Sequence, residues 1–171
     1  MNISGGTVIA LGSGQPETGL DCNSNARFEY TGGVIIAMGG GQNNTPQAEG
    51  TTAYTTTVNN ISAGKNYALI QNDTVVLAFK IPEGYSYGNC VLLGSGDLTT
   101  GSATLISACS VNAENCFESV LYYGIAEISN GKSISVTASN SAAFSFGGQV
   151  TGNPDNLPDR KHFGNRFGRP F

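Results

Sequence analysis

Three oxygen-bearing side chains at alternate positions are the clearest candidates for metal chemistry in this chain. Asp21, Asn23 and Asn25 follow one another at a spacing of two, which is how a calcium-binding loop begins. An EF-hand would also need a glycine at position 26, where the chain has Ala26, and a closing glutamate at the twelfth position. The pattern therefore predicts a shallow calcium site.

Two carboxylates lie close enough in sequence to complete such a site, namely Glu17 and Glu29. The alternative is an Asx-turn, in which Asp21 and its asparagine neighbours bond their own backbone at a corner of the chain. Both interpretations place the segment in a turn.

Tyrosines at short spacings are the candidates for binding sugar. Tyr85 and Tyr87 would share one face of an extended segment, and aromatic faces stack on the apolar side of a pyranose. Tyr54 is a further candidate for stacking, and Glu29 is a candidate for bonding sugar hydroxyls. The alternative for each tyrosine is a half-buried position in a strand.

Catalytic arrangements are poorly supported by the sequence. A glycosidase needs two facing carboxylates, for which Asp21 with Glu29 or Glu17 is the available set, and a lyase needs a base beside a cation, for which only Arg27 lies near. The sole histidine, His162, lies near the chain end, which excludes Ser-His-Asp chemistry in practice. We therefore expect no enzyme, with a polysaccharide lyase as the less favoured alternative.

A phrase that occurs twice predicts the elements that position these residues. Residues 3–10 (ISGGTVIA) and 30–37 (YTGGVIIA) share a Gly-Gly corner followed by a β-branched run, and the second begins 27 positions after the first. A fixed period of this size is typical of a β-solenoid. We expect the two copies to be parallel, stacked coils.

Composition favours an all-β protein. Of the 171 residues 24 are Gly, only 12% are charged and none is Trp. No apolar run approaches the roughly 20 residues that cross a bilayer, so we expect no membrane insertion in this segment. Met1 leads directly into the first Gly-Gly phrase, and we expect the export signal and further coils in a part that precedes it.

Charge is distributed unevenly along the chain. The net charge is −4, and four of the eight basic residues lie in the last dozen: Arg160, Lys161, Arg166 and Arg169. An acidic body lacks the basic face that phosphate binding requires, so nucleic acid is not the expected partner. The basic, aromatic end at 160–171 is predicted to be a flexible tail, with RNA binding as the alternative.

The remaining elements are short strands. We expect one domain in three parts, with coils and a loop in 1–50, a β-rich region in 51–152 and the tail in 153–171. The predicted strands cover residues 51–58, 66–70, 75–80, 89–93, 103–107 and 117–123. Strands on either side of 71–74, and of Asn130-Gly131, are predicted to form hairpins. Segments 39–50 and 108–116 are predicted loops.

Four cysteines permit two disulfides in an exported protein: Cys22, Cys90, Cys109 and Cys116. Their pairing does not follow from sequence. We favour a local bridge from Cys109 to Cys116, and free buried thiols are the alternative.

Residues 3–107 resemble a bacterial family of exported carbohydrate-binding proteins with a right-handed parallel β-helix. Gly19-Leu20-Asp21 and residues 30–34 match the family's coil phrase G-I-D-S-x-G-x-x-x-I-S-G-G-T-V, and residues 63–69, 75–82 and 85–95 are similar to its closing segment. Asn23 and Ala26 depart from that pattern. The resemblance implies binding of plant-type polysaccharides and acidic sugars, with calcium.

Together these observations predict the end of a right-handed parallel β-helix capped by an antiparallel β region. The expected function is non-catalytic polysaccharide binding at the bacterial surface or outside the cell. The alternative function is a structural adhesin or spacer that binds a protein partner through segments 39–50 and 108–116. The identity of the sugar and the oligomeric state do not follow from the sequence.

Overall fold

The computed structural model describes residues 1–12, 19–20, 29–39 and 54–138, with the backbone alone at 54–57. This part of the chain forms strands joined by turns and loops. In chain order they are β1 (Asn2–Ile3), β2 (Thr7–Leu11), β3 (Glu29–Tyr30), β4 (Val34–Gly39), β5 (Tyr54–Asn59), β6 (Asn66–Gln71), β7 (Thr74–Lys80), β8 (Cys90–Ser95), β9 (Gly101–Ser107), β10 (Ser110–Phe117), β11 (Leu121–Ser129) and β12 (Lys132–Ala138). The all-β prediction is confirmed.

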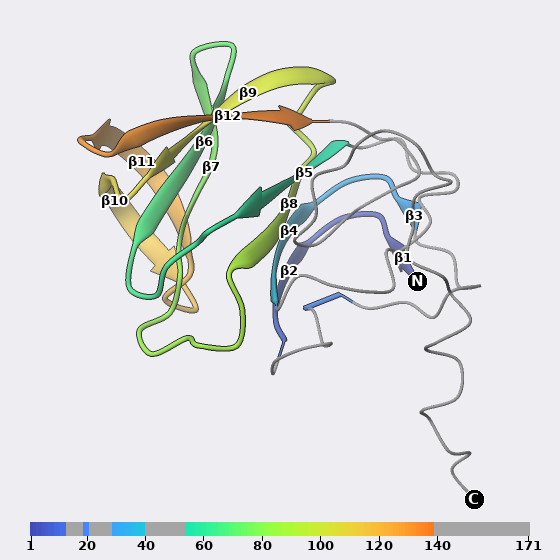
Figure 1. Ribbon diagram of the computed structural model, residues 1–171. Coiled ribbons are helices and arrows are strands. Elements are labelled where there is room, and N and C mark those ends of the chain that lie inside the picture. The colour runs from blue at the N-terminus through green and yellow to red at the C-terminus, as the bar shows by residue number, and fades with distance from the viewer. Residues whose placement is uncertain (13–18, 21–28, 40–53, 139–171) are drawn as a thin grey trace, which may run out of the picture.

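The strands form three sheets. They have the orders β1-β3, β2-β4-β8-β5 and β10-β11-β7-β6-β9-β12. In Figure 1 the six-stranded sheet lies at the left, the four-stranded sheet in the middle and the β1-β3 pair at the right. The strand pairs of the six-stranded sheet are antiparallel. In contrast, β1 pairs with β3, and β2 with β4, in parallel.

The two Gly-Gly phrases lie side by side as predicted. β2 pairs with β4 in parallel, with Thr7 beside Val34, and β1 pairs with β3 in parallel, with Ile3 beside Tyr30. The Val34 amide donates to the Gly6 carbonyl at 2.8 Å. The glycine corners therefore stack in the register that the sequence repeat specifies.

Only one of these corners is tightly enclosed. Gly33 has φ +96, and a Cβ there would lie 2.6 Å from the Gly6 carbonyl oxygen. Glycine alone tolerates both this backbone conformation and this close approach.

On its other side β4 has an antiparallel neighbour. β8 pairs with β4 and with β5 in antiparallel fashion, so the four-stranded sheet is mixed. Within the described ranges the parallel stack consists of two segments, and a parallel β-helix is not shown.

The first predicted hairpin is confirmed. β6 and β7 are antiparallel neighbours, with Asn66 opposite Lys80 and Gln71 opposite Thr74. Asn72 and Asp73 between them have φ 51 and 57, as a type I′ turn requires. Asparagine and aspartate tolerate this region better than most residues.

The predicted hairpin at Asn130-Gly131 is wrong. Both residues have the expected positive φ, 59 and 91, but β11 pairs with β10 and β7, whereas β12 pairs with β9. The chain bends here instead of reversing.

The bend belongs to one long antiparallel hairpin. Its first side is β9 followed by β10, and its second side is β11 followed by β12. The first side bends at Ala108, whose φ is 54, beside the bend at Asn130-Gly131. Each arm then pairs with a different strand of the β6-β7 hairpin, because β9 pairs with β6 and β11 pairs with β7.

Two further predictions in this region are wrong, because both segments belong to the long hairpin. Segment 108–116 is mostly strand β10 and not a loop, and residues 117–123 are not one strand, because the hairpin turns at Glu118 and Ser119 with φ 50 and 56. The Val120 amide closes this turn by donating to the Phe117 carbonyl at 2.9 Å. Neither turn residue is a glycine, so no turn pattern marked the position.

The predicted disulfide between Cys109 and Cys116 is wrong as well. Cys109, Cys116 and Cys90 are free, and Cys22 lies outside the described residues. Cys109 precedes β10 and Cys116 lies near its end, so seven extended residues separate them by about 23 Å, far beyond the reach of a disulfide. Cys90 and Cys109 are buried, in agreement with the alternative of free thiols.

The main core lies between the four-stranded and the six-stranded sheet. Its fully buried residues include Ile36 and Met38 on β4, Leu93 on β8, and Leu69 and Phe79 on the β6-β7 hairpin. A second cluster covers the opposite face of β4 and β8. These two central strands are thus buried on both faces, as continuous apolar runs usually are.

Tyr30 joins the parallel pair to the central sheet. Its ring is fully buried, and a Cβ at Gly94 would lie 3.0 Å from it. Its hydroxyl donates to the Gly33 carbonyl at 2.7 Å. Burial, and then the charge of Asp97, raise the pKa of Tyr30 well above its ordinary value.

Candidate functional site

The predicted sugar-binding tyrosines lie in the segment that joins β7 to β8, which we call the tyrosine loop (residues 81–89). Its first residue, Ile81, is fully buried, accepts a hydrogen bond from the Gly64 amide at 2.9 Å and donates to the Lys65 carbonyl at 3.0 Å. At its other end the Asn89 carbonyl accepts from the Ile61 amide at 2.9 Å. The loop is therefore fixed by backbone bonds at both ends.

A tight turn shapes the first half of the tyrosine loop. The Tyr85 amide donates to the Pro82 carbonyl at 3.2 Å, and Gly84 has φ 76, as the third residue of a type II turn requires. Glu83 forms an ion pair with Lys80 at 3.0 Å. The hydrogen bond and the charge of Glu83 raise the pKa of Lys80.

The structure brings Tyr85 and Tyr87 together. Their ring centroids are 6.1 Å apart, and the ring planes meet at 77°, an edge-to-face arrangement that favours the pair. Tyr85 is half-buried against the main core, whereas Tyr87 is 54% exposed. One ring is therefore an anchor, and the other is presented to solvent.

The Tyr85 hydroxyl is in an unusual position for a polar group. It is buried and has no hydrogen-bond partner. Burial, followed by the influence of Cys90, raises the pKa of Tyr85. An unpartnered buried hydroxyl costs roughly 1–3 kcal/mol.

Tyr54 and Glu29 lie away from the tyrosine loop. Tyr54 begins β5 opposite Ser95, the last residue of β8, whereas the tyrosine loop leads into Cys90, the first residue. These two ends of β8 are about 17 Å apart at 3.3 Å per residue.

Glu29 lies in the parallel pair β1-β3. Its carboxylate accepts a hydrogen bond from the Asn2 side chain at 3.1 Å. The four predicted residues thus form one close pair and two separate positions.

The predicted calcium ligands Asp21, Asn23 and Asn25 lie outside the described residues, as do Glu17 and Arg27. Among the residues that the structure describes, no three or more His, Cys, Asp or Glu side chains gather as a metal site would require.

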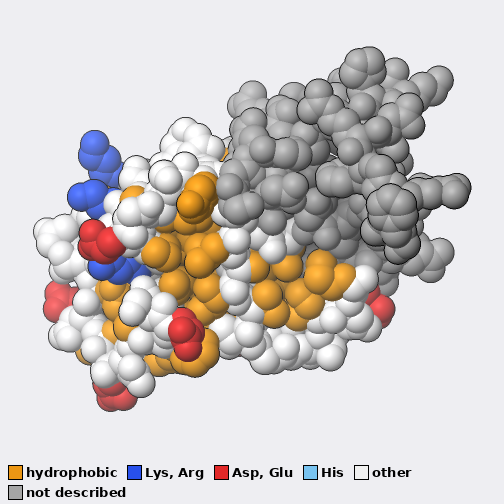
Figure 2. Space-filling model, turned by 90° about the horizontal axis from the view of Figure 1, so that it is seen from below, with side chains coloured by type: hydrophobic (Ala, Val, Ile, Leu, Met, Phe, Trp, Pro, Cys, Tyr) orange, Lys and Arg blue, Asp and Glu red, His pale blue; other side chains and the backbone are white. Residues whose placement is uncertain are grey.

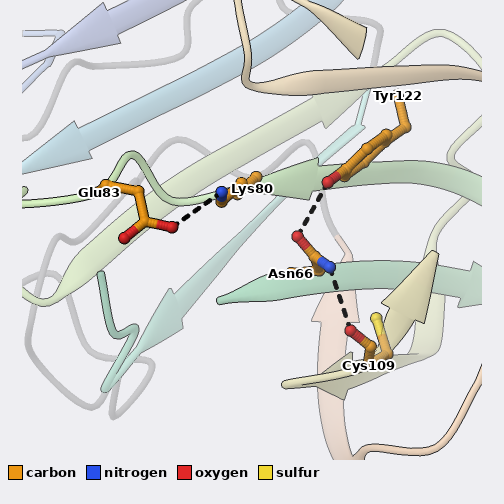
Figure 3. A network of polar contacts seen from close by, with 5 residues as sticks. All are labelled: Asn66, Lys80, Glu83, Cys109 and Tyr122. Carbon is orange, nitrogen blue, oxygen red and sulfur yellow. Dashed lines mark hydrogen bonds and ion pairs between the residues drawn. The ribbon is translucent and has the colours of Figure 1, made fainter. Parts of the chain in front are cut away.

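A polar network that the sequence did not reveal lies beside the tyrosine loop (Figure 3). The Tyr122 hydroxyl donates to the Asn66 side-chain oxygen at 2.9 Å, and the Asn66 side-chain nitrogen donates to the Cys109 carbonyl at 3.2 Å. Burial is the main cause that raises the pKa of Tyr122. The network ties the bend of the long hairpin to β6, and 56 residues separate Tyr122 from Asn66.

Hydrophobic side chains gather on the end of the molecule that carries the tyrosine loop. Figure 2 looks at this end from below and shows two hydrophobic patches, with lysine side chains at one side. The exposed large hydrophobic residues of the described part are Met1, Leu11, Tyr87, Phe117, Tyr123 and Ile134. Tyr123 thus provides a second exposed tyrosine, on β11, with which Tyr87 can be compared.

No protein-family model, curated protein or solved structure matches this chain. Within the described ranges, no helix has the length and apolar character needed to span a bilayer.

Proposed function

We propose that this protein binds polysaccharide without catalysing a reaction, and that the tyrosine loop is a contact site. The observation that supports this proposal is the exposed Tyr87 ring held edge-to-face by the anchored Tyr85 ring. An exposed aromatic face offers a surface for the apolar side of a sugar ring.

Rigidity of the loop supports the same proposal. Binding is weakened by the free energy needed to order side chains and loops, typically 0.5–1.5 kcal/mol for each immobilised side chain. Backbone bonds at Ile81 and Asn89 and the turn at Gly84 fix the tyrosine loop before any ligand arrives. Little further ordering is needed to present Tyr87.

Charged groups beside the loop suit a polar ligand. Glu83 is largely exposed while it pairs with Lys80. Its carboxylate is free on its outer side to accept hydrogen bonds from sugar hydroxyls. A long polymer would also reach the region of Tyr54, about 17 Å away along β8.

The coil architecture, the location and the calcium site that the sequence predicts are also part of this proposal. We take β1 to β4 as the last coils of a right-handed parallel β-helix, in which the ligand follows the stacked coils. The protein acts at the bacterial cell surface or outside the cell, and calcium binds at Asp21, Asn23 and Asn25. The parallel pairing of β1 with β3 and of β2 with β4 supports the coil assignment.

A pair of tyrosine variants tests the proposal. Binding to insoluble polysaccharides and to a glycan array is measured for Tyr87→Ala and for Tyr123→Ala, which removes a tyrosine that is 44% exposed on β11. We expect about three- to tenfold weaker binding for Tyr87→Ala, since an aromatic contact contributes about 0.5–1.5 kcal/mol beyond the area that it buries, and no change for Tyr123→Ala. Equal effects of both variants would contradict the role of the tyrosine loop.

Two further measurements test for calcium and for lyase activity. Addition of a chelator is expected to weaken binding if calcium takes part, and absorbance of unsaturated uronate products would reveal a lyase. Absence of binding to every glycan would contradict the proposal and favour the structural adhesin.

A further inference from the structure

The bend of the long hairpin is the feature from which a new inference follows. The β9-β12 ladder and the β10-β11 ladder each end at the bend with one residue pair: Ser107 with Lys132 and Ser110 with Ser129. Two residues on each side of the hairpin, 108–109 and 130–131, lie between these pairs. Because the two sides have equal lengths here, the hairpin can straighten without a shift of register.

Positive φ angles are concentrated at this bend. Ala108, Asn130 and Gly131 have φ 54, 59 and 91, whereas residues of an extended strand have negative φ. Positive φ is unfavourable for alanine and less so for asparagine. A Cβ at Gly131 would also lie 2.7 Å from the Ser107 carbonyl oxygen. A straight hairpin would relieve the strain at Ala108 and would let one ladder run through the bend.

The part of the hairpin beyond the bend, which we call the arm (residues 110–129), docks on the β6-β7 hairpin. β11 pairs with β7 at two residues, Leu121 and Tyr122. The Val120 carbonyl accepts a hydrogen bond from the Lys80 amide at 2.7 Å. On the face opposite to the main core, Tyr122 packs against the small cluster that contains Ala78. These partners of the arm lie on β7, and the β7 strand of a second copy offers the same partners.

We propose that two copies of this chain exchange their arms and form a domain-swapped dimer. In each copy the hairpin straightens at the bend and its arm docks on the β6-β7 hairpin of the other copy, where Leu121 lies beside Phe79 as in the monomer. The exchange is reciprocal, so a twofold axis relates the copies and the assembly is closed. The contacts of the arm with β6 and β7 are retained, and the bend changes its conformation.

The balance between monomer and dimer depends on the bend, because the docking contacts are the same in both forms. Association removes translational and rotational freedom, which favours the monomer in dilute solution. Relief of strain at Ala108 and new residue pairs through the bend favour the dimer. We therefore expect the dimer when the chain refolds at high protein concentration, and more dimer when a bend residue resists positive φ.

The first test changes the bend. Asn130→Val should raise the dimerisation constant at least tenfold, because a β-branched residue is strongly disfavoured at positive φ and is well suited to an extended strand. Size-exclusion chromatography with light scattering measures the dimer fraction after refolding over a range of protein concentrations. Ser133→Val places a valine at an exposed position of β12 and is the control, for which we expect no change. No increase for Asn130→Val would overturn the proposal.

The second test relaxes the bend. In the Asn130→Val chain, Ala108→Gly relieves strain in the bent form and should lower the dimerisation constant at least about threefold. Ala126→Gly, in β11 without a positive φ, is the matched control and should leave the constant unchanged. Equal effects at both alanines would overturn the proposal. If Asn130→Val does not fold, the wild-type chain refolded at its highest soluble concentration takes its place, and absence of dimer there would overturn the proposal.

Amide NMR of the dimer tests whether the arms are exchanged. We expect the shifts of the monomer throughout the described strands, except near residues 107–110 and 129–132. In a dimer of one isotope-labelled and one unlabelled copy, filtered NOE signals between Leu121 and Phe79 should connect different copies. Shift changes that cluster on a surface away from the bend, or NOE signals between these two residues within one copy alone, would show ordinary association and overturn the proposal.

Discussion

In the parallel pairs, equivalent residues of two similar segments lie side by side, whereas the long hairpin pairs segments that share no repeated phrase. Thr7 lies beside Val34 and Ala10 beside Ala37, but Lys132 lies opposite Ser107 and Thr137 opposite Ser102. Close contact between backbones sets the register of the first region. Turns and a shared bend set the register of the second.

The two regions also use positive φ differently. In the parallel part Gly6 and Gly33 supply it at the corners, and at Gly33 the neighbouring backbone is also too close for a side chain. In the antiparallel part Ala108, Glu118 and Ser119 adopt it although they are not glycines. An added methyl group at Gly33 should therefore lower the stability of the parallel part. Removal of the methyl group of Ala108 should raise the stability of the antiparallel part.

The largest expected effect tests the parallel corner. Gly33→Ala should lower the free energy of unfolding by about 3 kcal/mol, because alanine at positive φ costs about 1–2 kcal/mol and the overlap with Gly6 costs a further 1–3 kcal/mol. Urea denaturation measures the change. Gly5→Ala is the control, since its Cβ meets no described atom within 4 Å, and it should change stability by less than about 1 kcal/mol. Equal effects at both positions would mean that the corners are not stacked.

This contrast also explains what sequence could predict. The Gly-Gly corner followed by a β-branched run recurs at an interval of 27 residues, and this repeat correctly indicated that β2 and β4 are parallel neighbours. Asparagine and aspartate at 72 and 73 marked the β6-β7 turn, because both residue types tolerate the positive φ that the turn requires. Each of these two signals is a short pattern that can be recognised directly in the sequence.

The long hairpin gave no comparable signal. Its true turn is at Glu118-Ser119, while the strongest turn pattern, Asn130-Gly131, lies at the bend. Pairing with β6 on one arm and β7 on the other decides where the chain reverses, and this is a tertiary effect. The same holds for the site, because sequence spacing placed Tyr85 beside Tyr87 but could not show which ring is anchored.

The next effect concerns the hydroxyl that joins the parallel pair to the central sheet. Tyr30→Phe removes its bond to the Gly33 carbonyl and should cost about 1 kcal/mol at pH 7. Because the pKa of Tyr30 is raised in the native state, the unfolded state loses this proton first as the pH rises through about 10. Wild-type stability should then fall by up to ~1.4 kcal/mol per pH unit on account of this group.

Urea denaturation of both proteins between pH 7 and 11 measures this difference. The variant lacks that loss, so its disadvantage should shrink above pH 10 and disappear near pH 11. A constant disadvantage across this range would show that the Tyr30 hydroxyl is not buried in the native state.

A smaller gain is expected in the tyrosine loop, which connects the six-stranded sheet to the four-stranded sheet. Tyr85→Phe removes a buried hydroxyl without a partner and keeps the ring that positions Tyr87, so it should raise stability by about 1 kcal/mol and leave polysaccharide binding unchanged. Thermal unfolding and the polysaccharide assay measure the two quantities. A clear loss of stability would show that the hydroxyl has a partner in solution.

The smallest effect tests the bend of the long hairpin. Ala108 has φ 54, which costs an alanine about 1–2 kcal/mol, and glycine relieves this cost while losing about 0.5–1 kcal/mol through its greater freedom in the unfolded chain. Ala108→Gly should therefore stabilise the protein by about 0.5 kcal/mol, as measured by urea denaturation. Ala126→Gly is the matched control, because Ala126 lies in β11 without a positive φ, and it should destabilise by a similar amount. Opposite signs at the two alanines would show that the bend carries backbone strain in solution, whereas a loss at both would mean that Ala108 is not held in the left-handed region.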